Sequence, residues 1–233
     1  MAIEICIPAY NEERIIAESA GAVLRVLQKT GEDVAVIVAD NDSTDGTASA
    51  AKGIPGVSVL SIPIRGKGAA VAAAARHSGA DFFGFIDADL SADPEDILNL
   101  LPLVEKSGFD IAIGSRLIET TMVKRGAFRT LSSKAFNILR KMIVGVRSVE
   151  DTQCGLKIMN ARGRKILAGC TEKGWFLDME FLARAERAGL SIKEVPVHWN
   201  EHRFEDRKSK LVLLRDSVGA LRAMFRIRNV ISK

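Results

Sequence analysis

Two aspartates separated by one residue follow a strongly apolar stretch of the chain. Residues 82–86 combine aromatic and β-branched side chains over a length typical of a buried strand, and Asp87 and Asp89 come directly after them. Ligands of open α/β sheets bind outside the carboxyl ends of the strands. Paired carboxylates at that position suit Mg²⁺ or Mn²⁺, which take oxygen ligands and often share them with substrate phosphates. We therefore expect a divalent metal at Asp87 and Asp89; the alternative is a strand that simply ends in a polar turn.

The elements that would position these aspartates alternate between strands and helices. Apolar runs predict strands, and apolar faces at helical spacing predict the helices between them. Asn11 is expected to cap the first helix, Arg65-Gly66-Lys67-Gly68 to open an Ala-rich helix, and Asp93 to cap a third. Such alternation at short spacing is typical of a mostly parallel sheet with helices on its faces, so the expected fold class is α/β. The strands are expected at residues 3–7, 34–39, 57–62, 82–86, 110–114, 156–159 and 192–197, and later helices at 127–144, 178–188 and 211–227.

Length and composition limit the organisation of the chain. Its 233 residues, 47% of them hydrophobic, are enough for one large core, and we expect one domain over residues 1–210 followed by an amphipathic helix at 211–233. The sequence has no apolar run of transmembrane length and no basic-then-apolar secretory leader. The three cysteines have neither disulfide nor metal-ligand spacing. These features predict a cytoplasmic protein.

The charges are unevenly distributed. The net charge is only +4, but Lys and Arg gather at residues 116–147 and 202–233. A single Tyr and few other aromatic residues offer no stacking platform for bases, so we do not expect nucleic acid as a partner. The basic second half is suited instead to phosphates or to an anionic membrane surface.

Six short patches of the sequence form an ordered set along the chain. They are Pro8-Ala9-Tyr10-Asn11-Glu12, Asp40–Thr47, Arg65–Gly68, Asp87–Ser91, Gly114-Ser115-Arg116 and Asp151–Lys157. Taken together and in this order, they resemble family 2 glycosyltransferases. Within that family the likeness is greatest to the polyprenyl-phosphate sugar synthases of the dolichyl-phosphate mannose or glucose type, to which Asp151–Lys157 and Ser209-Lys210-Leu211 point. The resemblance implies a GT-A fold, a nucleotide-diphosphate-sugar donor, Mg²⁺ or Mn²⁺, and inversion at the anomeric carbon.

The resemblance implies a donor site at the ends of the first strands. Tyr10 would lie against the base, and Glu12, Asp40 or Asn41 would accept hydrogen bonds from base or ribose. Helix capping is the alternative for Asn11 and Glu12, and a solvated loop position is the alternative for Lys67. The full expected donor site is Pro8, Ala9, Tyr10, Asn11, Glu12, Asp40, Asn41, Lys67, Asp87, Ala88, Asp89 and Lys210.

The sequence departs from the family pattern at two positions of this site. Ser91 stands where relatives often have Gln, which puts a third protein ligand for the metal in doubt. Asp42 stands where the family usually has Gly, which leaves the backbone conformation there open. Near the C-terminus, the segment with Arg203, Arg207 and Lys210 resembles one that closes over the donor diphosphate in relatives. Either Arg203 or Arg207 would be the arginine of that segment.

A phosphate acceptor requires cations. Arg116 follows a sheet strand beside the expected site, and we expect Asp89 and Arg116 to be catalytic. The acceptor phosphate is expected to meet Arg116, Arg125, Arg129 and Ser133, with a solvated helix face as the alternative for Arg125 and Arg129. Because a phosphate oxygen is already an anion, its attack on a sugar needs no strong general base. A hydroxyl acceptor would need one, and the candidates, which could equally be structural carboxylates, are Asp151, Asp178 and Glu180.

The sequence thus predicts an inverting transferase that moves a hexose from a nucleotide sugar to a polyprenyl phosphate. The Asp151–Gly155 run resembles the glucose-type relatives, so we favour a UDP-sugar over a GDP-sugar. One alternative is a same-family enzyme that acts on a sugar or glycan hydroxyl. Others are a nucleotidyltransferase, which should have a Gly-rich, Arg-containing loop after the first strand, and a non-catalytic nucleotide-binding module. A homodimer is left open.

The last predicted helix has an apolar stripe with cationic flanks. We expect it to dock on the cytoplasmic face of a membrane without crossing it, because buried apolar area and attraction to anionic lipids add at such a surface. The alternative is that the stripe packs on the chain's own core or across a dimer. The stripe consists of Leu211, Leu214, Val218, Leu221 and Phe225, and its flanks are Arg215, Arg222, Arg226 and Arg228.

Overall fold

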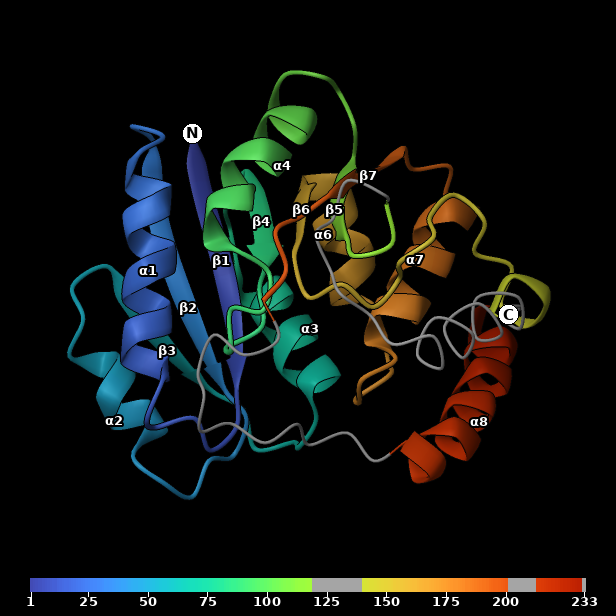
Figure 1. Ribbon diagram of the computed structural model, residues 1–233, viewed down its shortest axis with the longest axis horizontal. Helices are drawn as coiled ribbons and strands as arrows, with labels where there is room; N and C mark the ends of the chain where they lie inside the picture. The colour runs from blue at the N-terminus through green and yellow to red at the C-terminus, as the bar shows by residue number, and fades with distance from the viewer. Residues whose placement is uncertain (119–139, 201–212, 232–233) are drawn as a thin grey trace.

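The protein, seen in a computed structural model, is a mixed β-sheet between two layers of helices (Figure 1). The structure describes residues 1–118, 140–200 and 213–231, and only the backbone of residues 213–218 and 220. Within these residues the sheet has seven strands in the order β3-β2-β1-β4-β6-β5-β7. They are β1 (Ala2–Ala9), β2 (Asp33–Asp40), β3 (Val57–Ser61), β4 (Phe82–Phe85), β5 (Ile111–Ser115), β6 (Lys157–Asn160) and β7 (Ile192–Pro196).

The helices cover both faces of this sheet. Along β1, Ile3, Ile5 and Ile7 face a core with α1 and α4, whereas Cys6 faces the core formed with α3, α6, α7 and α8. The alternation follows from the strand period of two. The α/β fold class predicted from the sequence is therefore confirmed. The helices are α1 (Ile16–Gln28), α2 (Thr47–Lys52), α3 (Lys67–His77), the 3₁₀ turn η1 (Pro94–Asp96), α4 (Ile97–Glu105), α6 (Ala161–Ala168), α7 (Leu177–Arg187) and α8 (Leu213–Ile231).

One strand runs against the direction of the others. β1 pairs in parallel with β2 and with β4, and β5 pairs in parallel with β7. β6 lies between β4 and β5 and is antiparallel to both, so its first residue, Lys157, is opposite Phe85 at the carboxyl end of β4. The start of β6 therefore lies at the edge where the parallel strands end.

The chain between β1 and α1 differs from the prediction. α1 begins at Ile16, and Asn11 has a positive φ of 53°, in the left-handed region. An N-cap residue has extended dihedrals, so Asn11 cannot fill that role, and the prediction that it caps the helix is wrong. Asn side chains are among those that tolerate the left-handed region, because they form local hydrogen bonds there.

Two other helix starts show how local chemistry sets the ends. Asp93 accepts a hydrogen bond from the backbone N–H of Glu95 and precedes Pro94, as predicted. α6, which the sequence analysis did not predict, begins after Asn160, whose side chain accepts from the backbone N–H groups of Arg162 and Gly163. Of the helix predicted at residues 127–144, the structure describes only the end, from residue 140.

α8 packs against α7, on the side of the molecule away from α1 and α2 (Figure 1). Ala223, Met224 and Ile227 are buried there, whereas Leu221 and Phe225 are 40% and 52% exposed. The predicted stripe is thus exposed at these two positions, and an adjacent face of the helix packs on the core. Among the described residues, no helix is both long and apolar enough to cross a membrane. The division of the chain at residue 210 stays a prediction.

Candidate functional site

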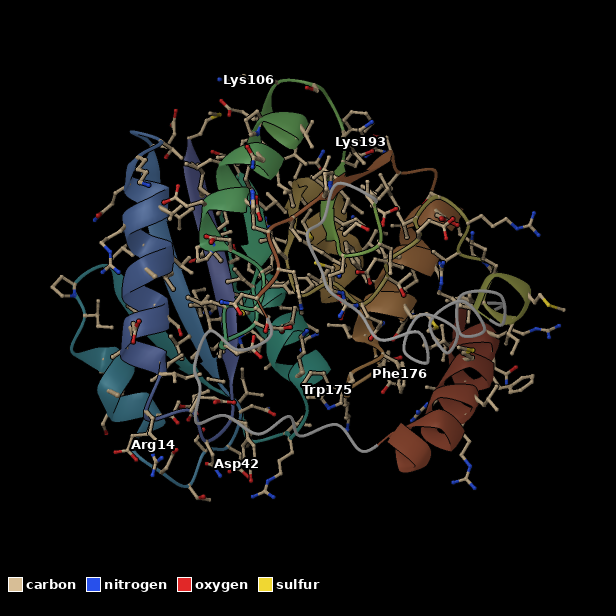
Figure 2. All side chains as sticks on the ribbon, viewed as in Figure 1. Arg14, Asp42, Lys106, Trp175, Phe176 and Lys193 are labelled. Atoms are coloured by element: carbon tan, nitrogen blue, oxygen red, sulfur yellow. The ribbon has the colours of Figure 1, made fainter. Side chains whose placement is uncertain are left out.

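The turns after β1 and β2 are joined by hydrogen bonds at one edge of the sheet. Asn11 accepts from the backbone N–H of Thr44 at 2.8 Å, and the backbone N–H of Glu12 donates to the Thr47 hydroxyl at 2.8 Å. Figure 2 shows Arg14 and Asp42, which follow these strands, at this edge, and Lys106 and Lys193 at the opposite one. Asp42 has a φ of 61°, a left-handed conformation that suits glycine, the residue usual at this position in the family pattern.

Two neighbouring residues at the end of β2 have different surroundings. The side-chain amide of Asn41 donates to the carbonyl of Ile64 and accepts from the N–H of Gly66, both at 2.5 Å, so it holds the loop before α3. Asp40 is buried, and among the described residues its Oδ1 has no hydrogen-bond partner. A buried polar atom without a partner is costly, so Asp40 is the better candidate to accept a hydrogen bond from a ligand.

An ion pair connects the start of α3 to the aspartates after β4. Lys67, the first residue of α3, places its Nζ 2.6 Å from Oδ1 of Asp87 and 3.8 Å from Oδ2 of Asp178. Asp178 accepts in turn from Nζ of Lys157 at 2.5 Å, and Lys157 also donates to the carbonyl of Cys154. The four side chains therefore form an alternating series of charges, Asp87–Lys67–Asp178–Lys157.

The attraction between Lys67 and Asp87 shifts the pKa of each toward its charged form. Burial acts to lower the pKa of Lys67. The negative charges of Asp87 and Asp178 raise it by more than burial lowers it, so the net shift of the pKa is upward. Burial acts to raise the pKa of Asp87, but the ammonium groups of Lys67 and Lys157 outweigh it, and the net shift is downward. Both lysines also lie within 6 Å of the Phe85 ring, at 5.8 and 5.3 Å, a distance at which a cation is attracted to an aromatic face.

The surroundings of Asp87 and Asp89 fit a divalent cation that is shared with a ligand. The Lys67 ammonium already supplies a positive charge at Asp87, and a Cβ on Gly155 would displace the Asp87 carboxylate from its present position. Asp89 accepts from the backbone N–H of Ser91 at 3.1 Å. In the described ranges, no group of three or more His, Cys, Asp or Glu residues could hold a metal. Mg²⁺ is commonly held by one or two carboxylates with phosphates and waters, so two aspartates suffice for that arrangement.

Arg116, the predicted acceptor ligand, is paired with Asp151. Its Nε and Nη2 donate to the two Asp151 oxygens at 2.7 and 2.8 Å, and its guanidinium lies 4.8 Å from the centre of the Trp199 ring. Burial acts to raise the pKa of Asp151, but Arg116 outweighs it and the net shift is downward. A carboxylate that is buried, paired and acidic is poorly suited to act as a general base.

The carboxylates of the other two candidate bases also form ion pairs within the protein. Asp178 is 2% exposed and lies between the two lysines. Glu180 is buried and accepts from the backbone N–H groups of Thr171 and Glu172 and from Nε of Arg184. Glu180 therefore fixes the loop before α7, which carries Trp175 (Figure 2). The centre of the Trp175 ring lies 5.6 Å from the Lys67 ammonium.

The structure brings most of the predicted donor residues to one edge. Pro8 and Ala9 end β1, Ala88 lies between the two aspartates, and the Tyr10 ring lies 5.2 Å from the Arg65 guanidinium. Lys157 and Asp178 belong to this site as a charge pair that the sequence analysis did not foresee. The sequence did point to each residue separately, since Lys157 ends the sixth patch of the family pattern and Asp178 is a candidate base. Outside the described residues lie Arg125, Arg129, Ser133, Arg203, Arg207 and Lys210.

Comparison with known proteins identifies the family of this chain. The sequence model described as "Glycosyl transferase family 2" matches residues 4–163. Because it covers more than half of the chain, the protein belongs to glycosyltransferase family 2.

Individual relatives make the likeness more specific. The chain is 30% identical to a dolichyl-phosphate beta-glucosyltransferase of Saccharomyces cerevisiae, over 97% of this chain and 74% of that protein. It is 28% identical to the glycosyltransferase AglD of Haloferax volcanii, but spans only 35% of that protein's length. Among solved structures, glucosyl-3-phosphoglycerate synthase of Mycobacterium tuberculosis, in complex with Mn²⁺, UDP and glucosyl-3-phosphoglycerate, is similar with a TM-score of 0.67 and 25% identity. That match covers 97% of this chain and 76% of the other.

Proposed function

We propose that this protein transfers a hexose, with inversion, from a UDP-sugar to a polyprenyl phosphate. The observation that carries the proposal is the arrangement of charges at the sheet edge. The aspartate pair and Lys67 form one part of the site, and Arg116 forms a second cationic part that Asp151 holds in place. The similarity to a dolichyl-phosphate beta-glucosyltransferase supports the lipid phosphate as acceptor and glucose as the sugar.

The donor would lie across the ends of β1, β2 and β4. The free Oδ1 of Asp40 can accept a hydrogen bond from an N–H or O–H group of the nucleoside. Lys67 opens α3 and can bind a phosphate oxygen, a role that the N-terminus of a helix favours. Asp87 and Asp89 would hold Mg²⁺ or Mn²⁺, which supplies charge stabilisation to the departing nucleoside diphosphate.

The acceptor is proposed to be a phosphate because the three candidate bases are each paired with a cation. An alcohol needs a base to take its proton, and Asp151, Asp178 and Glu180 are each buried against a cation. A phosphate oxygen needs only to be held in line with the anomeric carbon, on the face opposite the leaving group. Asp151 uses Nε and Nη2 of Arg116, and within the part of the chain that the structure describes the Nη1 group of this 24%-exposed side chain has no hydrogen-bond partner, so it could bind a second anion.

A lipid acceptor also requires contact with a membrane. Leu221 and Phe225 on α8 are exposed, and Arg222 and Arg228 beside them are exposed as well. We propose that this face binds peripherally at the cytoplasmic surface of a membrane, where apolar burial and anionic lipids act together.

A panel of donors and acceptors tests the function. The purified protein with Mn²⁺ is offered UDP-glucose, UDP-galactose or GDP-mannose, each with polyprenyl phosphate, 3-phosphoglyceric acid or a glycan. We expect a lipid-linked sugar only from a UDP-sugar and polyprenyl phosphate, and a β-anomer by NMR if the donor is α-linked. Transfer only to phosphoglycerate or to a glycan hydroxyl would replace the lipid acceptor. Release of pyrophosphate from UTP and glucose 1-phosphate would indicate the nucleotidyltransferase instead.

A further inference from the structure

Lys67 and a divalent cation require the same carboxylate. The Lys67 ammonium lies 2.6 Å from Oδ1 of Asp87, one of the two aspartates that would hold the cation. Asp178 lies 3.8 Å from the same ammonium on its other side. We propose that Lys67 competes with the cation for Asp87, and that Asp178 receives the Lys67 ammonium when Asp87 binds the cation. This inference rests on the proposed function for the donor and adds an order of binding to it.

The ammonium of Lys67 has little freedom to leave the site. Its side chain is only 10% exposed and lies near the rings of Phe85 and Trp175. The backbone on both sides of Lys67 is packed tightly, because a Cβ on Gly66 would clash with the carbonyl of Lys173 and one on Gly68 with that of Glu172. The N–H of Ala69 also donates to the carbonyl of Lys173. An ammonium held in this way needs an anion at close range in every state of the protein.

Asp178 is built to be that second anion. Lys157, which is fully buried, binds Oδ1 of Asp178 at 2.5 Å, so the other oxygen is the one nearer Lys67. The carbonyl of Cys154 fixes Lys157 from the opposite side. Because Asp178 is pinned through one oxygen, a small movement of Lys67 exchanges one carboxylate for the other. Asp178 therefore acts through Lys67, as a positioning residue.

The balance of charge predicts how the cation and the donor depend on each other. Without donor, an added cation would share Asp87 with an ammonium, and like charges at short range repel. The described residues provide no third carboxylate, histidine or cysteine to complete a metal site. The diphosphate of the donor brings negative charge that both Lys67 and the cation can bind. The cation and the donor should therefore bind together, each raising the affinity for the other by the same factor.

The test is Mn²⁺ affinity in the absence of donor, measured by titration calorimetry and by the electron paramagnetic resonance of free Mn²⁺. Lys67→Met removes the competing charge and keeps an unbranched side chain that is one atom shorter. We expect Lys67→Met to bind Mn²⁺ about tenfold more tightly than the wild type, since a charge within a few ångströms is removed. The matched control Lys67→Arg keeps the charge and should bind Mn²⁺ as weakly as the wild type. Equal affinities for Lys67→Met and the wild type would overturn the competition.

The part played by Asp178 is tested in a double-mutant cycle. Asp178→Asn should weaken donor-free Mn²⁺ binding when Lys67 is present, by about tenfold, and by at most about threefold when Lys67 is Met. An equal loss in both backgrounds would show that Asp178 acts only as a nearby negative charge and would overturn its positioning role. Circular dichroism and Tm accompany each variant, because Asp178→Asn leaves buried Lys157 without its carboxylate. Should that variant not fold, Asp178→Asn combined with Lys157→Met removes both charges and serves in the same cycle.

Two measurements on the wild type, UDP binding and sugar transfer, distinguish a failure of this inference from a failure of the proposed function. If the wild type transfers sugar but Lys67→Met gains no affinity for Mn²⁺, only the competition is overturned. If Lys67→Met gains affinity but the wild type neither binds UDP nor transfers sugar, the competition is supported and the proposed function fails. With UDP present, the wild type should gain more Mn²⁺ affinity than Lys67→Met does. Equal gains would contradict the proposed joint binding.

Discussion

The guanidinium of Arg116 and the carboxylate of Asp151 form a two-bonded ion pair, with N–O distances of 2.7 and 2.8 Å. The same carboxylate accepts from the backbone N–H of Arg116 at 3.0 Å. The face of the Trp199 ring lies beside the guanidinium, 4.8 Å away. Arg116 is thus oriented by the protein itself, and such an orientation would lower the entropy lost on binding the proposed acceptor phosphate.

Replacing Arg116 tests its proposed contact with the acceptor phosphate. Arg116→Ala should lower kcat/KM for polyprenyl phosphate by about 2–3 kcal/mol, roughly 30- to 150-fold, the range for a hydrogen bond to a charged group. The affinity for UDP, measured by calorimetry, should change by less than about twofold. The double variant Arg116→Ala with Asp151→Asn removes the orphaned carboxylate and serves as the control for stability. If affinity for UDP collapses in both variants, Arg116 belongs to the donor site.

Replacing Asp89 tests the cation. Asp89→Ala should abolish transfer and the Mn²⁺-dependent part of UDP binding, because only Asp87 would remain of the pair. The fold should be retained, and the far-ultraviolet circular dichroism spectrum checks this. Asp33→Ala, at the exposed start of β2, is the matched control and should leave turnover unchanged. Normal turnover of the Asp89 variant, or of the wild type in excess chelator, would remove the metal from the proposed reaction.

The pair of His198 and Asp96 predicts a pH-dependent stability. The Asp96 carboxylate, 3.0 Å from Nδ1 of His198, raises the pKa of the imidazole through their hydrogen bond and the attraction of opposite charges. A pKa raised by folding adds stability that is fully present below the unfolded value of about 6.5 and is lost as pH rises through the folded value. The Tm of the wild type should therefore exceed that of His198→Gln below about pH 6.5, and the difference should vanish at higher pH. A difference that grows from pH 6 to pH 9 would contradict this assignment.

The exposed apolar residues of α8 predict membrane binding. Leu221→Ser with Phe225→Ser should remove flotation with anionic vesicles and leave Tm unchanged, because both side chains are exposed. Flotation of the wild type should need anionic lipid, since each basic residue near such a surface contributes about 1 kcal/mol. Ile64→Ser is the matched control, as Ile64 is exposed on the loop before α3. Equal flotation of the wild type and the double variant would leave this face without a lipid-binding role.

Structural features that depend only on neighbouring residues in the sequence were predictable. The apolar run before Asp87 forms β4, and Asp93 caps the turn after it, because strand patterning and capping depend on a few adjacent residues. The meeting of the turns after β1 and β2 also followed, since consecutive strands of such sheets are commonly neighbours. Asn11 shows where this reasoning failed. Its hydrogen bond to Thr44, 33 residues away, competes with capping, and local preference carries no information about that partner.

The sequence by itself determined the class of fold, the family pattern and the position of Asp87 and Asp89 at the end of a strand. Only the tertiary structure decided that Asn41 holds a loop, that Asp151 pairs with Arg116, and that Lys67 reaches Asp87. The antiparallel direction of β6 brings Lys157 to the edge where the parallel strands end, and Lys157 pairs with Asp178 there. Alternating apolar residues predict a strand but carry no sign of its direction or its neighbours. Charges that are distant in sequence therefore meet only once the order and direction of the strands are set.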